Sequence, residues 1–478
     1  MGAGGVTTMF ELKPRFTPAL DPEFVPAVLW NRAYRALVRQ TRGSRPFAIA
    51  LTRADGRSSV WRGEVLPSWH VEAALTLRYV ERLLKFLLWQ RGGCRVLIVG
   101  APEIAIELKN HYSPRGGRAF DHRFMGDEVY GRGFTVESGL WADLPKEEPD
   151  ALTVGRHLGG CRIGFDLGGS DRKASAVIDG KVVYSEEIPW DPYFQADPAY
   201  HIEGVQDSLL RAAAHLPRVD AIGGSAAGVY VNNEVRVASL FRGVPRDRFD
   251  ASIRRMFFDL RERWGGVPFE VVNDGEVTAL AGSMSLGDNA VLGVSMGTSM
   301  AAGYVTPEGG ITPWLNELAF APIDYAEGAP ADEWSGDRGC GVQYFSQQGV
   351  NRLALRGGIT FPDAMPLPER LVAVQASMAA GNERAQAVYE SIGTVLGYSV
   401  AHYADFYELR NVLVLGRVTS GAGGEVILEK AREVLRGEFA GLAERVRLAM
   451  PDEKDKRHGQ AIAAASLPAP GAASSLKP

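Results

Sequence analysis

Cysteine is scarce in this chain of 478 residues, which contains only Cys94, Cys161 and Cys340. The three lie far apart, and no two of them form a CxxC pair. A disulfide framework or a cysteine-rich zinc site needs more cysteines at closer spacing. We therefore expect three reduced thiols, which is the usual state of cysteine in a cytosolic protein.

Long apolar runs and a strong net charge are also missing. No stretch reaches the roughly 18 apolar residues that a membrane span needs, and the first residues, MGAGGVTTMFELKPRF, lack the apolar core of a signal peptide. The 52 Lys and Arg residues nearly balance 57 Asp and Glu residues, for a net charge of −5. We therefore expect a cytoplasmic protein that binds neither membrane nor nucleic acid.

Three common catalytic or nucleotide-binding signatures are absent. There is no GxxxxGK[ST] motif, which excludes a P-loop protein, and no GxGxxG follows a strand, which leaves a dinucleotide fold unsupported. The stretch GGSAAG has Ala227 where the hydrolase elbow GxSxG requires glycine.

Length and composition favour a globular protein of two or three domains, with 46% hydrophobic and 23% charged residues. In the first 155 or so residues we predict a hairpin around Asp55-Gly56 and an amphipathic helix that ends at Gly92. The Gly-rich segment 118–134 could reach over an active site or pack between domains, and we favour packing.

A second pattern begins at Cys161, where strands alternate with helices. This alternation is typical of α/β lobes with mixed sheets. Two strand pairs interrupted by glycine, near residues 166 and 297, suggest two similar lobes.

Four glycine-bearing loops are each expected to follow an apolar strand. A glycine there lets backbone N–H groups approach an anion, and a neighbouring hydroxyl adds a donor. A glycine turn is more often an ordinary hairpin, but four at the ends of buried strands indicate a phosphate site. The loops are DLGGS (166–170), GGSAAG (223–228), MGT (296–298) and LG (415–416).

Asn273 and Asp274 stand where the predicted strand VPFEVVND leads into a helix. A carboxylate at that position can point into a cleft and take a proton from a substrate hydroxyl. The alternative is that Asp274 only caps the helix. Beside the glycine loops, we favour the catalytic interpretation.

The segment from about Gly160 to Leu467 resembles the ROK family of sugar kinases, within the actin/hexokinase/Hsp70-type ATPase superfamily. The resemblance lies in five motifs in the family's order: IGFDLGGSDRKASAVIDGKVV, VDAIGGSAAGVYVNNEVRVASLFRGVP, VPFEVVNDGEVTALAG, VLGVSMGTSMAAGYV and NVLVLGRVTSG. It covers about two-thirds of the sequence. It implies an α/β, two-lobed actin-like ATPase (ribonuclease H-like) fold with mixed sheets, preceded by a separate α/β N-terminal domain.

The resemblance also implies a role for each site residue. Asp274 would be the general base, and Asn273 and Glu317 would bind sugar hydroxyls. Asp166 would hold Mg²⁺ through water, in keeping with that ion's preference for few carboxylates. The phosphates and adenosine of ATP would contact Gly168, Gly169, Ser170, Lys173, Gly297, Thr298 and Gly416. Lys173 could equally be a solvated turn residue. A homodimer is suggested by the resemblance alone.

Three departures from the family pattern concern the sugar side and the nucleotide side. Phe320 stands where the family has a zinc-binding histidine, and only Cys340 remains of the Cys-rich element. One thiol cannot make a tetrahedral zinc site, so we expect no structural zinc, with Asp324, Asp337 and Arg338 ordering that loop instead. Arg417 replaces a glycine of the adenosine motif. The loss of the histidine removes a possible sugar contact and favours a different or modified polyol over glucose, whereas Arg417 would narrow or alter nucleotide binding.

We divide the chain into an N-terminal domain of unknown role (1–155), lobe I (156–285), lobe II (286–467) and a disordered tail (468–478). The function we predict is ATP-dependent phosphorylation of a sugar or related polyol. The alternatives are a non-catalytic sugar or nucleotide sensor of the same fold, and an ATPase or kinase acting on something other than a sugar. The N-terminal domain has no clear basic recognition helix, which disfavours DNA binding.

Overall fold

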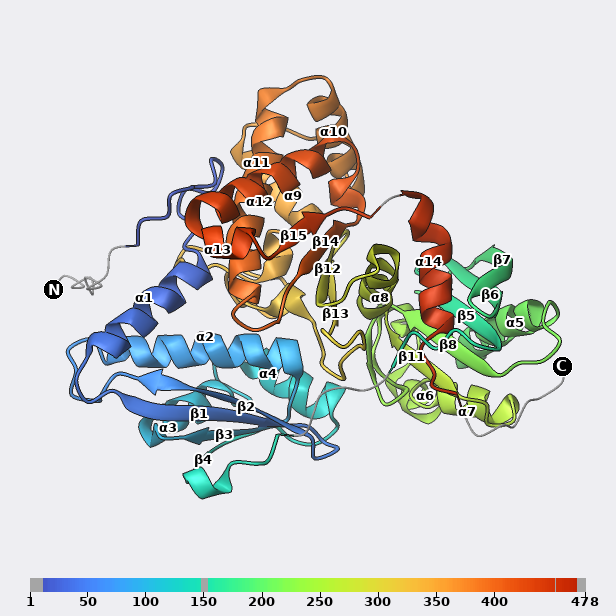
Figure 1. Cartoon of the computed structure of the whole chain (residues 1–478), viewed down its shortest axis with the longest axis horizontal. Helices are drawn as coiled ribbons and strands as arrows, with labels where there is room; N and C mark the ends of the chain where they lie inside the picture. The colour runs from blue at the N-terminus through green and yellow to red at the C-terminus, as the bar shows by residue number, and fades with distance from the viewer. Residues whose placement is uncertain (1–11, 148–153, 452, 471–478) are drawn as a thin grey trace.

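The structure is a computed structural model that describes residues 12–147, 154–451 and 453–470. Three units follow one another along the chain: an N-terminal α/β unit, a first lobe and a second lobe (Figure 1). The tail predicted to be disordered falls mostly outside these ranges, since only residues 468–470 of it are described.

The N-terminal unit is a four-stranded sheet in the order β2-β1-β3-β4, with helices packed on it. The predicted hairpin is confirmed, because β1 and β2 pair antiparallel up to Thr52 opposite Ser58, with Gly56 in the turn at φ +89°. The elements are α1 (Ala27–Gln40), β1 (Arg45–Thr52), β2 (Ser58–Val65), α2 (Ala74–Arg91), β3 (Arg95–Val99), α3 (Pro102–His111), α4 (Ala119–Arg123), a π-helical turn (Phe124–Val129) and β4 (Thr135–Gly139).

Helix α2 is buried on nearly every side. It lies between the N-terminal sheet and the second lobe (Figure 1), so that even Lys85 and Gln90 are fully buried. It ends as predicted at Gly92, whose φ of +78° suits a glycine at a helix C-terminus. The segment 118–134 also packs inside the molecule, with Asp121 and Phe124 buried, which confirms the packed alternative.

The first lobe is built on a mixed sheet in the order β11-β8-β5-β6-β7. Strands β5, β8 and β11 are parallel, so their carboxyl ends meet at one edge, while β5, β6 and β7 form an antiparallel meander. The elements are β5 (Cys161–Leu167), β6 (Asp171–Ile178), β7 (Lys181–Pro189), α5 (Pro198–Ala213), β8 (Ala221–Ala226), β9 (Val229–Val231), β10 (Glu234–Val237), α6 (Arg246–Arg248), α7 (Met256–Arg263), β11 (Phe269–Asn273) and α8 (Asp274–Leu286).

The second lobe has a four-stranded sheet in the order β13-β12-β14-β15. Its β12–β13 hairpin stands beside the parallel strand β14, as the β5–β6 hairpin stands beside β8, which agrees with the expected likeness of the two lobes. The elements are β12 (Val291–Met296), β13 (Met300–Val305), α9 (Gln347–Arg356), α10 (Leu367–Ala379), α11 (Glu383–Tyr403), β14 (Asn411–Leu415), α12 (Ala422–Glu438), α13 (Ala440–Ala443) and β15 (Arg447–Ala449).

The chain then returns to the first lobe, where α14 (Glu453–Ala465) packs across β5 and β8 (Figure 1). Two strand glycines permit this close approach: a Cβ on Gly164 would lie 2.2 Å from the carbonyl oxygen of Ala461, and one on Gly223 would lie 1.8 Å from that of Ala464. The expectation that the glycines of GGSAAG follow a strand was therefore wrong for Gly223 and Gly224. Both lie inside β8.

The N-terminal unit and the second lobe share one continuous apolar core. Residues such as Leu87 and Trp89 of α2 belong to the same cluster as Leu318 and Tyr403 of the second lobe. The first lobe has its own core around Phe165 and the helices on its sheet. The N-terminal unit therefore packs against the second lobe through this core. The domain boundaries 1–155, 156–285 and 286–467 remain predictions.

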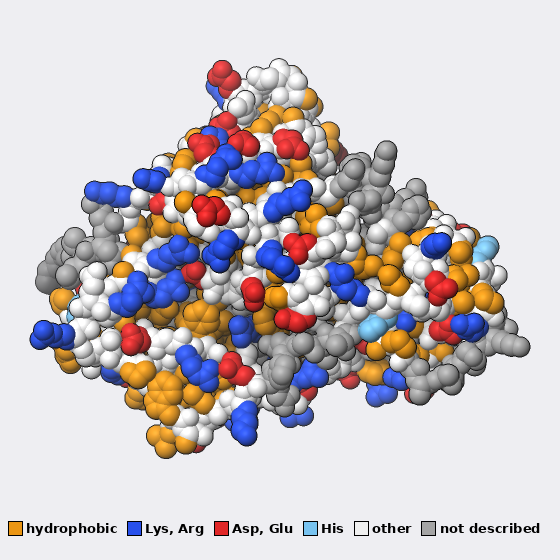
Figure 2. All heavy atoms as spheres, in the orientation of Figure 1, with side chains coloured by type: hydrophobic (Ala, Val, Ile, Leu, Met, Phe, Trp, Pro, Cys, Tyr) orange, Lys and Arg blue, Asp and Glu red, His pale blue; other side chains and the backbone are white. Residues whose placement is uncertain are grey.

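On the face shown in Figure 2, basic and acidic side chains are interspersed over the second lobe. On α12, Glu429 lies within ion-pairing distance of Arg432 and Arg436. Within the described ranges no helix combines the length and apolar character that a membrane span requires.

The close packing of α14 makes a prediction for Gly223→Ala. The new methyl group would collide with the backbone of α14, so we expect a loss of about 3 kcal/mol in the free energy of unfolding, measured by urea denaturation. Gly441→Ala is the matched control, because nothing lies within 4 Å of a Cβ at that position. Equal stabilities of the two variants would contradict the packing described for α14.

Candidate active site

The parallel strands of the first lobe bring Asp166 and Asp274 to the same edge of the sheet. Asp166 lies opposite Ser225 in the β5–β8 pairing, one residue before the strand ends. Asn273 lies opposite Ala226 at the end of β11, and Asp274 is the first residue of α8. Ligands of open α/β sheets bind at such carboxyl edges, so this edge is where a substrate would be expected.

Asn273 is the residue that caps α8. Its Oδ1 accepts a hydrogen bond of 2.7 Å from the Gly275 N–H, and its Nδ2 donates one of 2.7 Å to the Gly228 carbonyl oxygen. Asp274 Oδ1 also accepts from the Gly275 N–H, at 3.0 Å. Both ends of the Asn273 amide are therefore bonded to backbone, and Asn273 and Asp274 share the Gly275 N–H. The predicted contact of Asn273 with a sugar hydroxyl stays a prediction.

Asp274 is a half-buried carboxyl group with a raised pKa. Burial raises the pKa of Asp274 to about 6, and the nearby Asp166 carboxylate adds to the shift, while hydrogen bonding from the Gly275 N–H opposes it. Burial also raises the pKa of Asp166, although a hydrogen bond with Ser225 and the charge of Lys173 act against this.

Four carboxyl groups are arranged in a row, each close enough to affect the next. Burial raises the pKa of Glu317 to about 7, with Asp274 as the charge that adds to it. Burial likewise raises the pKa of Glu276 to about 8, and Glu317 contributes. The row therefore runs from Asp166 through Asp274 to Glu317 of the second lobe, and then to Glu276 on α8. Sequence reasoning missed Glu276, which lies only two residues after Asp274.

The turn between β5 and β6 contains the predicted phosphate-binding residues Gly168, Gly169 and Ser170. The Gly168 N–H closes the hairpin by donating to the Asp171 carbonyl oxygen at 2.9 Å, and the Trp190 indole donates to the Gly168 carbonyl at 2.8 Å. A Cβ on Gly169 would lie 2.0 Å from the Tyr193 hydroxyl, so only glycine fits there. The Ser170 hydroxyl donates to the Asp171 carboxylate at 2.8 Å, and the predicted phosphate contacts of this turn stay predictions.

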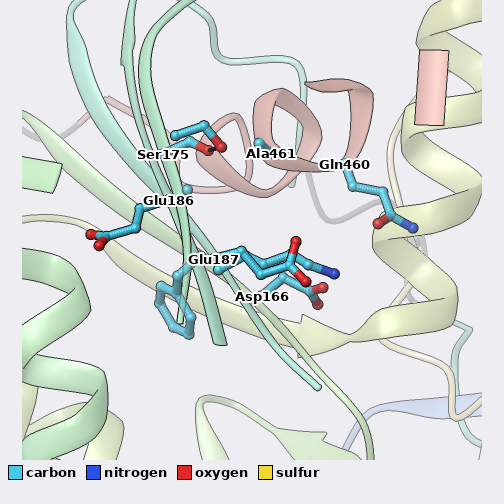
Figure 3. Close-up of a pocket in the computed structure, with 10 residues that line it drawn as sticks. Asp166, Ser175, Glu186, Glu187, Gln460 and Ala461 are labelled. Carbon is cyan, nitrogen blue, oxygen red and sulfur yellow. Dashed lines mark hydrogen bonds between the residues drawn. The ribbon is translucent and has the colours of Figure 1, made fainter. Parts of the chain in front are cut away.

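Lys173 lies opposite Asp166 in the β5–β6 pairing. Its Nζ lies 3.2 Å from Asp171 Oδ1, and it lines a cavity of about 260 Å³ between the strands and α14. Figure 3 shows Asp166 and Glu187 side by side in this cavity, with Glu186 pointing away from them. The other lining residues are Gly164, Phe165, Ser175, Ser185, Gln460 and Ala461.

The second lobe presents its own glycine turn at the end of β12. Gly297 and Thr298 form the tip of the β12–β13 hairpin, where the Gly297 N–H donates to the Ser299 carbonyl oxygen and its carbonyl accepts from the Gln347 N–H, both at 2.9 Å. Gly416 follows β14 at φ +101°, and a Cβ there would lie 2.4 Å from the Met296 carbonyl oxygen. Gly416 therefore lies beside the residue that precedes Gly297, and the predicted contacts of both glycines with ATP stay predictions.

Asp166 is the residue predicted to hold a magnesium ion. Mg²⁺ is usually bound through one or two carboxylates together with phosphate oxygens and water. A single half-buried carboxylate fits that pattern. Among the described residues, no three His, Cys, Asp or Glu side chains come together as a metal-binding group. An ion at Asp166 would thus depend on the nucleotide for its other ligands.

Glu317 is attached to the N-terminal unit through its backbone. The Glu317 N–H donates to the Trp89 carbonyl oxygen and the Asn316 N–H to that of Gln90, both at 2.9 Å. Phe320, which stands where the family has histidine, packs on the ring of Trp89 at 4.3 Å between centroids. The predicted acceptor side of the site is therefore built on the end of α2.

The loop around Cys340 is held by hydrogen bonds and ion pairs, as expected for Asp324, Asp337 and Arg338. Asp324 accepts from the Val25 N–H at 2.9 Å, and Arg338 donates to the Ala329 carbonyl oxygen at 2.9 Å. Asp337 pairs with three cations that sequence reasoning missed, at 3.2, 3.5 and 2.5 Å: Arg82, Lys85 and Arg118. All three belong to the N-terminal unit.

Comparison with known proteins finds relatives in fold. No protein-family profile and no curated protein matches the chain. Among solved structures, a ROK hexokinase from Thermus thermophilus is 20% identical with a TM-score of 0.51, over 64% of this chain and 97% of that one. A ROK family transcriptional regulator, described as a homologue of the E. coli MLC protein, is 18% identical with a TM-score of 0.51, over 64% and 78%.

At these identities the likeness shows the fold. The two lobes have the actin-like ATPase fold in the form found in ROK-family proteins, preceded by the N-terminal α/β unit. One of the two similar structures is a hexokinase and the other a transcriptional regulator, so the fold alone does not choose between catalysis and regulation.

The row of carboxyl groups predicts a pH-dependent stability. Their pKa values are raised on folding, so the folded state binds protons more tightly, and stability falls as pH rises from about 4.5 toward 8. Glu276→Gln removes one of these titrating groups. The free energy of unfolding in urea should therefore fall less steeply between pH 5 and 8 in this variant than in the wild type, with a difference in slope of up to about 1.4 kcal/mol per pH unit. Asp247→Asn, at an exposed position, is the control. Parallel pH dependences for wild type and Glu276→Gln would refute the shift.

Proposed function

We propose that this protein catalyses ATP-dependent phosphorylation of a hydroxyl group on a sugar or related polyol, with Asp274 as general base. The observation that supports this most strongly is the position of Asp274. It is a half-buried carboxyl with a pKa of about 6, at a carboxyl edge shared with Asp166 and next in the carboxyl row to Glu317. A general base works best with a pKa near the working pH.

In this mechanism Asp274 accepts the proton of the acceptor hydroxyl as that oxygen attacks the transferred phosphoryl group. Asn273 keeps the carboxylate oriented through the cap of α8. Glu317, with a pKa of about 7, is present in both protonation states near neutral pH, so it can either accept from or donate to a second hydroxyl of the acceptor. Phosphoryl transfer depends mainly on such positioning and on charge neutralisation.

Residues of both lobes would hold the nucleotide. Asp166 would bind Mg²⁺, which supplies charge neutralisation at the phosphates when bound. Gly169 and Ser170 in one lobe and Gly297 and Thr298 in the other would face the phosphates, with Lys173 adding positive charge. Gly416 would lie against the adenosine. The likeness in fold to a ROK hexokinase supports this assignment.

The second candidate function is a non-catalytic sugar or nucleotide sensor. Two observations favour it: the apolar Phe320 on the acceptor side, and the fold likeness to a ROK transcriptional regulator. A sensor would bind a sugar or nucleotide without turnover. The intact set of Asp166, Asp274 and the two glycine turns favours catalysis.

The test is release of ADP from Mg-ATP in the presence of a panel of sugars, amino sugars and polyols. We expect at least one acceptor to stimulate release. Asp274→Asn should lower kcat by about 10²–10⁴-fold with an unchanged circular dichroism spectrum, whereas Asp247→Asn should behave as wild type. Below pH 6 the wild-type kcat should fall about tenfold per pH unit as Asp274 becomes protonated.

Three results would count against the proposal. Binding of a sugar without turnover would favour the sensor. ADP release that no acceptor stimulates would favour an ATPase acting on something else. Full activity in Asp274→Asn would assign the base to another residue.

A further inference from the structure

The last turn of α2 supports the backbone of the acceptor loop. The final carbonyl groups of a helix have no partner within the helix, and here those of Trp89 and Gln90 accept from the N–H groups of Glu317 and Asn316. These bonds fix the backbone at Glu317. They also join two segments that lie more than two hundred residues apart in the chain.

Asn316 is held from the opposite side by Glu276 of α8 and Tyr407 of the second lobe. It has a left-handed φ of +49°, which is uncommon for a residue other than glycine. Its Nδ2 donates to Glu276 Oε1 at 2.5 Å, and its Oδ1 accepts from the Tyr407 hydroxyl at 2.7 Å. The surrounding contacts therefore determine the direction in which the chain enters Glu317.

An aromatic cluster fixes the loop on the other side of Glu317. Phe320 lies 4.3 Å from the ring of Trp89, and within 5.7 and 6.3 Å of those of Phe120 and Phe124, between centroids. Trp89, Phe120 and Phe124 all come from the N-terminal unit. Phe320 is the only second-lobe member of these contacts, so the cluster fastens the loop to that unit.

A buried ion network holds Trp89 in place. The Trp89 indole donates to Asp121 Oδ1 at 2.6 Å, and the same oxygen lies 2.6 Å from the Nζ of Lys85, which is completely buried. Lys85 also lies 3.5 Å from Asp337 in the loop that follows Phe320. Buried charges of this kind lose much of their stabilisation if one partner moves, so the network favours a single geometry.

We propose that the N-terminal unit serves as a positioning element for acceptor binding: α2 and its buried partners, with Trp89 at their centre, hold Glu317 in the geometry that an acceptor hydroxyl requires. This inference rests on the proposed function for the role of Glu317. It gives residues 12–147 a task within the site, although none of them is assigned a contact with substrate. Trp89 and Lys85 are positioning residues.

The test compares Trp89→Leu with Phe47→Leu in the full-length protein. Phe47 is buried in the same core on β1, and its ring contacts Tyr79 in the first half of α2, away from Trp89. Trp89→Leu should raise the KM for the acceptor at least tenfold while the KM for ATP changes less than twofold. Trp89→Phe, which keeps a ring against Phe320, should restore the acceptor KM to within about threefold.

A second readout does not require activity. Carbon-13 NMR of labelled glutamate carboxyls should show the pKa of Glu317 falling from about 7 toward its ordinary value in Trp89→Leu, because the side chain gains access to water. Phe47→Leu should leave that pKa unchanged at a similar loss of melting temperature. If Trp89→Leu does not fold, Phe320→Ala tests the same contact from the second lobe.

The outcomes separate the two proposals. An unchanged Glu317 pKa and acceptor KM in Trp89→Leu, or equal changes in Phe47→Leu, would overturn the positioning role. If no acceptor is phosphorylated by the wild type, the proposed function fails, and the NMR titration alone decides whether the N-terminal unit positions Glu317.

Discussion

Two backbone hydrogen bonds, from Asn316 and Glu317 to the carbonyl groups that end α2, join the N-terminal unit to the loop that carries Glu317. Much of the structure is arranged around this contact. Helix α2 is buried on nearly all sides because the N-terminal sheet covers one face and the second lobe the other. The shared apolar core follows from the same arrangement, since the residues beside these bonds pack into both units.

The second organising feature is electrostatic. Asp166, Asp274, Glu317 and Glu276 form a row of carboxyl groups in which burial and neighbouring charges raise each pKa. Such a row costs stability as the groups ionise, and groups of this kind concentrate at functional sites. Parts of it are supported by hydrogen bonds, with Ser225 at Asp166, and Asn316 and the Tyr304 N–H at Glu276. The carboxyl groups at its centre, Asp274 and Glu317, are those that the proposed chemistry uses.

Local signals made several elements predictable from the sequence. Gly56 and Gly92 mark a turn and a helix end that depend on left-handed backbone conformations, and both were recognised. The placement of Asp166 and Asn273-Asp274 at strand ends followed from apolar runs of strand length. Gly223 shows the limit of such reasoning. From the sequence alone, a strand glycine that allows a helix to pack closely cannot be distinguished from a glycine in a phosphate-binding turn.

Contacts between distant segments left no comparable signal. Two such contacts are the ion pairs of Lys85 with Asp121 and Asp337 and the packing of Trp89 on Phe320. The spacing between these residues follows no periodic pattern that the sequence could reveal. The sequence shows that Phe320 stands where the family has a histidine, but it does not show which aromatic side chains pack against Phe320. The return of α14 to the first lobe was hidden in the same way, since it depends on the packing of Gly164 and Gly223.

Hydrogen exchange of the Asn316 and Glu317 amides, followed by NMR, tests most directly whether the N-terminal unit and the acceptor loop act as one structure. If they do, both amides exchange as slowly as the amides in the middle of α2, because breaking their hydrogen bonds requires α2 to separate from the second lobe. Exchange of the two amides at the rate of an exposed loop, while α2 remains protected, would contradict the account.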